Sequence, residues 1–290
     1  MSKENEETED TKEYIKSIIN KLNIDSTKSP MFFGPPLNLQ RYDRVRYKSN
    51  LDFFKEQIGY FWRPEEIALD NETADWNKMS EAQQHIFIKN LSYQILLDSV
   101  QGRGIHNIIK HTSNTEIEAF GTWWQAAEVM HSYSYSWIIM NLFSKPSEVF
   151  DDILNDKEIL KRASSVTRYY DDLIEKMDGE TSEYELKKQF YLTLVSINIL
   201  EGIRFYVSFA CAYGFAERKL MEGNAKIIQL IQRDENLHLG FTQFTLKKFR
   251  DEPSEGFQDI VKDCEETVIQ MYKDAAQEEI EWADYLFKDG

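Results

Sequence analysis

A short carboxylate–imidazole motif occurs twice in the chain. Glu128-Val-Met-His131 and Glu235-Asn-Leu-His238 both read Glu-x-x-His. In an α-helix, residues three apart lie on one face, so each motif places a carboxylate beside an imidazole, one turn away. Carboxylate oxygens and imidazole nitrogens together are ligands that suit iron or manganese. The repeated motif therefore predicts a metal site built from two halves.

One further acid precedes each motif at a comparable distance. Asp98 lies thirty residues before Glu128, and Glu201 lies thirty-four before Glu235. Either spacing carries the chain down one helix, round a turn and back along the next, so each acid can lie level with its motif. Two such helix pairs facing each other would bring six ligands together: Asp98, Glu128, His131, Glu201, Glu235 and His238. That is the ligand set of the ferritin-like di-metal carboxylate proteins, built inside a helical bundle.

The surroundings of these acids favour a metal site over solvated charges. In a chain with 50 acidic residues and five histidines, one Glu-x-x-His can arise by chance. Glu201, however, follows the apolar run LVSINIL, Asp98 follows ILL, and Glu235 follows IIQLI within one turn. A carboxylate on such a face is buried, and an uncompensated buried charge is costly. Cations are the natural compensation.

Tyr135 shares the helix face of the first motif. It lies four residues after His131 and seven after Glu128, whereas Tyr133 points well away. Three apolar side chains at helical spacing from the other ligands are expected to form a dry sleeve around its ring: Phe205, Phe209 and Ile231. Beside an oxygen-activating metal pair, such a tyrosine is a candidate for oxidation rather than an ordinary core residue.

The remaining histidines and the two cysteines are expected to have ordinary roles. His85, His106 and His111 have no Glu three residues before them, which predicts surface or hydrogen-bonded side chains. Cys211 and Cys264 are too few for a disulfide framework and lack zinc-site spacing, so we expect small core residues.

Long helical segments predict an all-α fold. Four of the six prolines precede residue 65, which leaves the rest of the chain free for long helices. Ser80 with Gln83, and Ser182 with Glu185, have the spacing of capping boxes. Helices are expected over residues 41–61, 80–111, 115–143, 158–177, 182–213, about 225–249 (after a break at Gly223–Asn224) and 256–287, with no strands. Lengths of this kind are typical of a helical bundle.

The N-terminal region has a different character. Residues 1–12 are polar and acidic and are expected to be disordered, with a short amphipathic helix over 13–23. The proline-rich segment 29–39 is expected to be extended, with an exposed aromatic pair. We therefore divide the chain into an acidic, partly disordered extension, residues 1–25, and a ferritin-like di-iron domain, residues 26–290.

Composition excludes several other classes of protein. A formal net charge of −16 argues against a nucleic-acid-binding surface, which needs clustered Lys and Arg. No signal peptide opens the chain, and no apolar run is expected to reach the roughly 20 residues of a membrane span. The expectation is a cytoplasmic protein.

Several longer segments match one known family. They are SPMFFG (29–34), FWRPEE (61–66), LDSVQGR (97–103), EVMHSYSY (128–135), EGIRFYVSFA (201–210) and RDENLH (233–238). Together they resemble the small subunit of class Ia ribonucleotide reductase, in the form found in enteric bacteria and their large phages. The resemblance extends from about Pro30 to Gly290.

The resemblance implies specific roles for the metal ligands. Asp98, Glu128 and His131 would hold one iron, and Glu201, Glu235 and His238 the other, with Glu128 and Glu235 available to bridge. Manganese remains possible with the same ligands.

It also implies a radical route and a partner. Tyr135 matches a tyrosine that carries a stable radical, formed with ferrous iron and O2. Trp62 and Asp234 match the residues that, with His131, lead toward the large subunit, where ribonucleotide is reduced to deoxyribonucleotide. The small subunit is expected to be a homodimer.

Both ends of the chain depart from the family pattern. About twenty-five residues precede the part that the family requires. After Glu281–Gly290 the family continues with another helix and a flexible tail, which binds the large subunit and carries the next tyrosine of the route. We expect either a second polypeptide to supply that segment or the sequence to be an abbreviated form.

Other functions remain open on the residues alone. An iron-storage protein or ferroxidase shares the bundle and ligands but has no need for Tyr135, Trp62 and Asp234 together. A di-iron hydroxylase or desaturase usually has Glu where Asp98 stands. A metal-free partner subunit would not need the full ligand set.

Overall fold

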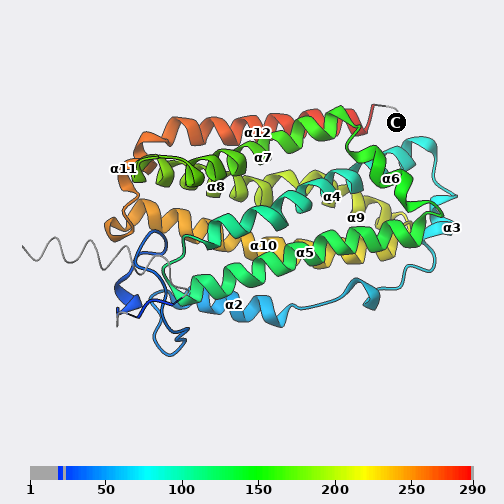
Figure 1. The fold of residues 1–290 in the computed structure, drawn as a ribbon. Coiled ribbons are helices and arrows are strands. Elements are labelled where there is room, and N and C mark those ends of the chain that lie inside the picture. The colour runs from blue at the N-terminus through cyan, green and yellow to red at the C-terminus, as the bar shows by residue number, and fades with distance from the viewer. Residues whose placement is uncertain (1–18, 22–23, 289–290) are drawn as a thin grey trace, which may run out of the picture.

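The described residues of the computed structural model, 19–21 and 24–288, form a bundle of long helices (Figure 1). In that part of the chain, the only strand-like pairing is an isolated bridge between Phe32 and Thr112. The α-helices are α2 (Lys48–Gly59), α3 (Glu72–Trp76), α4 (Glu81–Ile109), α5 (Thr115–Leu142), α6 (Pro146–Ile153), α7 (Lys157–Asp178), α8 (Glu183–Ile199), α9 (Tyr206–Glu217), α10 (Glu222–Asp251), α11 (Gln258–Asp263) and α12 (Glu265–Leu286). The all-α prediction is confirmed.

The helices pack side by side along the bundle. Helix α4 packs against α5 and α7, α8 against α7 and α10, and α2 covers the outer side of α5. Figure 1 shows α7 and α12 along one side of the bundle and α2 along the other. The α4, α5, α8 and α10 segments lie between them, which is where the sequence places the candidate ligands.

Helix ends follow the predicted caps closely in the central helices. Ser80 Oγ accepts from the Gln83 amide, and Gln83 Oε1 accepts from the Ser80 amide, which completes the capping box of α4. At α8, Ser182 accepts from the Glu185 amide. The helices expected over 80–111, 115–143 and 158–177 are observed to within two residues.

The helix expected over 182–213 is interrupted at the candidate ligand. Residues Leu200–Arg204 form a π-helix between α8 and α9, and Glu201 lies within it. A π-helical turn inserts one extra residue into the helix and is frequent at functional sites. The interruption changes the face on which the residues after Glu201 project.

The helix expected over 41–61 begins only at Lys48, and a buried carboxylate binds the two backbone amides that precede it. Glu116 Oε1 accepts from the backbone N–H of Arg46 and of Tyr47, at 3.0 and 2.9 Å.

The proline-rich segment 29–39 is less exposed than predicted. Phe32 is 1% exposed and its ring meets those of Phe190 and Phe249, so the expectation of an exposed aromatic pair was wrong.

The expected disordered residues 1–12 and most of the helix expected over 13–23 lie outside the described residues. Residues 19–21, which are described, are not helical. The domain boundary after residue 25 stays a prediction.

One segment is long and apolar enough to cross a membrane, contrary to the expectation from sequence. It is Glu183–Glu217, which meets this test by length and composition only, and 67% of its most apolar part is buried inside the protein. It spans α8 and α9 in the centre of the bundle, which is the position of a core helix in a soluble protein.

Helix α12 is joined to the π-helix by a buried charged cluster. Arg204 pairs with Glu278 at 2.7 Å and lies 3.9 Å from Glu279, whose other neighbour is the Tyr93 hydroxyl at 3.0 Å. Burial raises the pKa of Glu279 to about 7, although Arg204 and Tyr93 partly stabilise its anion. The carboxyl group therefore resists ionisation at neutral pH.

We expect Glu279→Gln to be nearly neutral at low pH and stabilising at high pH. Because the pKa is higher in the folded state, the contribution of Glu279, on the order of 3 kcal/mol, is present below its unfolded pKa and is lost as the pH rises through the folded value. Urea unfolding on either side of pH 7 measures the difference. Glu266→Gln, on the exposed side of α12, is the control; an identical pH dependence of stability in wild type and Glu279→Gln would contradict the prediction.

Candidate metal centre

All six predicted ligands lie in the interior, on four helical segments. Asp98 comes from α4, Glu201 from the π-helix, and the two Glu-x-x-His motifs from α5 and α10. Each side chain is at most 1% exposed. The burial expected from the apolar neighbours of these acids in the sequence is confirmed.

The six residues form two overlapping groups. In each group the candidate ligand atoms lie within 4.8 Å of one another: Asp98, Glu128, His131 and Glu235 in one, Glu128, Glu201, Glu235 and His238 in the other. Glu128 and Glu235 belong to both groups. A carboxylate shared by two groups is placed where it can bridge two cations.

Each histidine turns Nδ1 toward the carboxylates. His131 Nδ1 lies 3.0 Å from Glu235 Oε1 and 3.4 Å from Glu128 Oε2. His238 Nδ1 lies 2.9 Å from Glu235 Oε2 and 3.1 Å from Glu128 Oε1. Both imidazoles thus present the same nitrogen to the cluster.

The outer nitrogens have partners of their own. His131 Nε2 lies 3.2 Å from Asp234 Oδ2, and His238 Nε2 lies 2.9 Å from Gln57 Oε1. Such acceptors hold the proton on Nε2, which leaves the Nδ1 lone pair for a metal ion.

Several ligand atoms of the cluster are available to bind cations. Among the described residues, these ligand atoms are buried without a hydrogen bond: both Asp98 oxygens, Glu128 Oε2, Glu201 Oε2, Glu235 Oε1 and His131 Nδ1. Four carboxylates in a dry interior need positive charge. The donor set of oxygen and imidazole nitrogen fits two divalent cations such as iron or manganese.

The pKa values of the ligand side chains also indicate that the cluster favours positive charge. Burial, reinforced by the neighbouring carboxylates, raises the pKa of Asp98 and of Glu201 well above the usual range. Burial opposes charge on Glu235, but His131 prevails and holds the pKa of Glu235 below its usual value. Burial lowers the pKa of both histidines, but Glu128 and Glu235 outweigh it and raise the pKa of His131 and His238, with Asp234 adding to the effect at His131. The cluster therefore favours bound positive charge, which either protons or metal cations can supply.

Tyr135 lies beside the first group, as the helix-face argument predicts. It is fully buried, and its hydroxyl lies near the Asp98 carboxylate without a hydrogen bond of good geometry. Burial, together with the charges of Asp98 and Glu235, raises the pKa of Tyr135 well above its usual value. Tyr133, in contrast, is 41% exposed and donates to Glu65 Oε1.

The expected sleeve residues Phe205, Phe209 and Ile231 are all buried. The rings of Phe205 and Phe209 stack with their centroids 5.6 Å apart. Their packing around the Tyr135 ring stays a prediction.

A chain of polar contacts leads away from His131. Trp62 Nε1 donates to Asp234 Oδ2 across 2.9 Å, and the same oxygen lies 3.2 Å from His131 Nε2. Trp62 is 6% exposed and lines a hollow beside Phe61, a side chain that is 61% exposed. The contacts thus connect the cluster with the surface near the end of α2.

Sequence reasoning missed several side chains that contact the ligands. Trp124 Nε1 donates to Glu128 Oε1 across 2.7 Å, and Gln101 Nε2 donates to Glu201 Oε1 across the same distance. Helical spacing could have found Trp124, four residues before Glu128, but Gln101 reaches a ligand on another helix.

The other predicted structural residues lie outside the cluster. His106 is exposed, His85 packs on Tyr285, and His111 stacks on Phe33, with burial lowering its pKa to about 4. Both cysteines are free thiols; Cys264 is buried and Cys211 partly so.

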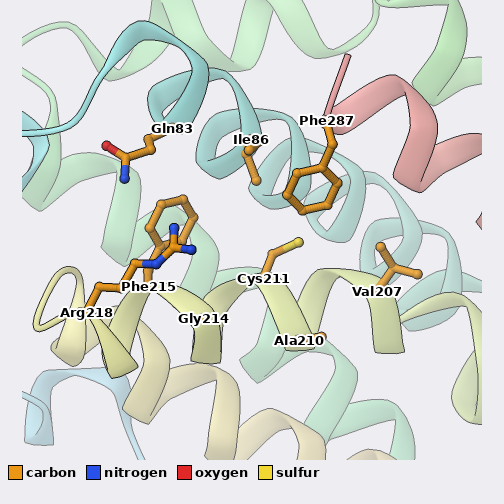
Figure 2. Close-up of a pocket in the computed structure, with 9 residues that line it drawn as sticks. All are labelled: Gln83, Ile86, Val207, Ala210, Cys211, Gly214, Phe215, Arg218 and Phe287. Atoms are coloured by element: carbon orange, nitrogen blue, oxygen red, sulfur yellow. The ribbon is translucent and has the colours of Figure 1, made fainter. Parts of the chain in front are cut away.

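A separate hollow of about 330 Å³ lies between α4 and α9. Figure 2 shows Cys211 and Phe215 of α9 on one side, with Phe287 projecting toward them from the end of α12. Apolar side chains form most of its lining, together with Gln83 and Arg218, and none of the six ligands lines it.

Fold and site together define a class of protein. A bundle of long helices that converges four buried carboxylates and two imidazoles is a ferritin-like fold with a di-metal carboxylate site.

Comparison with known proteins narrows this class to one family. Residues 40–290 match the family model for the ribonucleotide reductase small chain. The chain is 46% identical over 286 residues to ribonucleoside-diphosphate reductase 1 subunit beta of Escherichia coli O157:H7, covering 92% of this chain and 76% of that protein. The corresponding subunit of Enterobacteria phage T4 is 38% identical over 301 residues, covering 94% and 78%. A ribonucleotide reductase R2 subunit from Clostridium botulinum has a TM-score of 0.83 at 26% identity, covering 94% and 83%.

The chain therefore belongs to the ribonucleotide reductase small-chain family, as the six matching segments predicted. It is a beta subunit of ribonucleoside-diphosphate reductase, an oxidoreductase component that works with a large subunit.

Proposed function

We propose that the buried cluster holds two iron ions and that Tyr135 beside it carries a stable radical used by the large subunit. The observation that carries the proposal is the pair of overlapping ligand groups, sharing Glu128 and Glu235, with Tyr135 next to Asp98. When bound, the two metal ions would supply the O2-dependent oxidant. The protein supplies position, protons and shielding.

Tyr135 and Asp98 are suited to the oxidation itself. Tyr135 remains a neutral phenol before it reacts, since its pKa is raised by burial and nearby anions. Loss of one electron from the phenol also releases its proton, and Asp98 is the neighbouring carboxylate that can accept it. The radical would be long-lived because the ring has no exposure to water or reductants.

Trp62, Asp234 and His131 would carry the oxidising equivalent outward. Their side chains are joined by contacts of 2.9 and 3.2 Å, without an intervening gap. Asp234 can hold the proton of either neighbour while the electron moves.

The identity of the metal and the assembly are further parts of the proposal. The ligands accept both iron and manganese, and iron is preferred on the family resemblance.

A homodimer in the cytoplasm is proposed, and one solved structure of the same fold, from Saccharomyces cerevisiae, is described as a ribonucleotide reductase homodimer. A second polypeptide that supplies a C-terminal docking segment stays a prediction. A ferroxidase, the alternative, would leave the Trp62 contacts without a role.

We expect Asp234→Asn to separate radical formation from its use. Metal content and the tyrosyl EPR signal should remain, while reduction of ribonucleoside diphosphate with the large subunit falls on the order of 100-fold, since the amide cannot hold the shared proton. Because the chain spans 76% of the length of its Escherichia coli relative, the assay is run with and without the remaining segment of that relative fused to it.

Asp171→Asn, at an exposed position of α7, controls for the substitution itself. Turnover at the wild-type rate by Asp234→Asn would show that the oxidising equivalent leaves by another route.

A further inference from the structure

One oxygen of the Glu201 carboxylate is held by a neighbouring amide. Gln101 Nε2 donates to Glu201 Oε1 across 2.7 Å, and both side chains are fully buried. Glu201 Oε2 has no hydrogen-bond partner among the residues that the structure describes. The two oxygens of this carboxylate are therefore distinct before any cation binds.

The amide of Gln101 is itself oriented by Tyr170. The Tyr170 hydroxyl donates to Gln101 Oε1 across 2.7 Å. An amide has an acceptor end and a donor end, so a donor at its oxygen leaves the NH2 group facing the other way, toward Glu201. With the amide turned over, its oxygen would oppose the carboxylate. Tyr170 thus selects the orientation in which Gln101 donates to the ligand.

The backbone of α4 makes room for Tyr170 at Gly104. This glycine lies three residues after Gln101 on the same helix face, and a Cβ added there would lie 2.3 Å from Cζ of the Tyr170 ring. The ring is 4% exposed. Close packing of α7 on α4 therefore fixes the hydroxyl at the Gln101 amide.

The matching acid of the other half-site has no such restraint. Neither oxygen of Asp98 accepts a hydrogen bond of good geometry among the described residues, although the Tyr135 hydroxyl lies nearby, whereas Glu201 has one oxygen engaged and one unpartnered. Asp98 and Glu201 thus differ in how many oxygens they can offer, although both are terminal acids of their groups.

We propose that Tyr170 and Gln101 are positioning residues that restrict Glu201 to offering a single oxygen, Oε2, to the metal ion bound with His238. The inference rests on the metal centre proposed above. Asp98 keeps both oxygens available, so the two metal positions are inequivalent. Removing the Tyr170–Gln101 hydrogen bond weakens binding of the ion beside Glu201 and leaves the affinity for the ion beside Asp98 unchanged.

Anaerobic titration with Mn(II), followed by the EPR signal of the free ion, measures the two affinities without any turnover. In Tyr170→Phe, which removes one hydroxyl, one ion is expected to bind about tenfold more weakly, the lower end of the effect of losing a partner of a metal ligand. Gln101→Leu removes the hydrogen-bond donor to Glu201 and is expected to lower the affinity for the same ion by up to about 100-fold. Tyr169→Phe is the matched control, because its hydroxyl contacts only the exposed Arg168 among the bonds described.

A double-mutant cycle with Glu201→Ala assigns the effect to one half-site. In Glu201→Ala, which keeps the Asp98 half, adding Tyr170→Phe is expected to change nothing further. Equal weakening of both ions by Tyr170→Phe, an undiminished effect in the Glu201→Ala background, or no effect on either ion would overturn the inference. Wild-type protein that bound no Mn(II) would overturn the metal centre as well, which distinguishes the two failures.

Discussion

Glu235→Ala is expected to abolish binding of both metal ions, whereas Glu201→Ala is expected to lose only one. Glu235 belongs to both ligand groups, and its two oxygens face His131 and His238. Glu201 belongs to one group. Iron analysis after anaerobic loading should therefore give about two ions per chain in wild type, about one in Glu201→Ala and almost none in Glu235→Ala.

Glu222→Ala, an exposed glutamate at the start of the same helix, is the control and should keep both ions. Circular dichroism establishes that each variant remains helical. Retention of two ions by the Glu201→Ala, Glu235→Ala double variant would mean that the metals bind elsewhere.

Tyr135→Phe is expected to bind the same metal yet give no tyrosyl signal. The substitution removes only the phenolic oxygen from a fully buried ring, so the ligands keep their places while the oxidisable group is lost. EPR spectra recorded after loading with iron(II) and O2 should show a sharp tyrosyl signal in wild type and none in the variant.

Tyr133→Phe serves as the comparison, since Tyr133 is partly exposed and bonded to Glu65 rather than turned toward the cluster. If Tyr133→Phe abolished the signal and Tyr135→Phe kept it, the assignment from helix faces would be wrong.

The ligands could be predicted because helical spacing carries most of the information about them. Glu128, His131 and Tyr135 lie on one face of α5 by periodicity alone, and their neighbours in the sequence predict burial. The central helices were equally predictable, because the Ser80 cap and the apolar pattern act locally.

The remaining features depend on contacts between distant residues. Nothing local in LEGIR predicts a π-helix; its Arg204 pairs with Glu278, seventy-four residues later. Glu116, on α5, binds the amides that precede α2, and Tyr170, on α7, orients the Gln101 amide. A sequence pattern read one segment at a time contains none of these pairings.

The most direct test is the location of the iron by anomalous diffraction at the iron absorption edge, in crystals of the iron-loaded protein. The account predicts two peaks inside the bundle, one among Asp98, Glu128 and His131 and the other among Glu201, Glu235 and His238. A single peak in the cluster, or iron found only on exposed acidic groups, would contradict it.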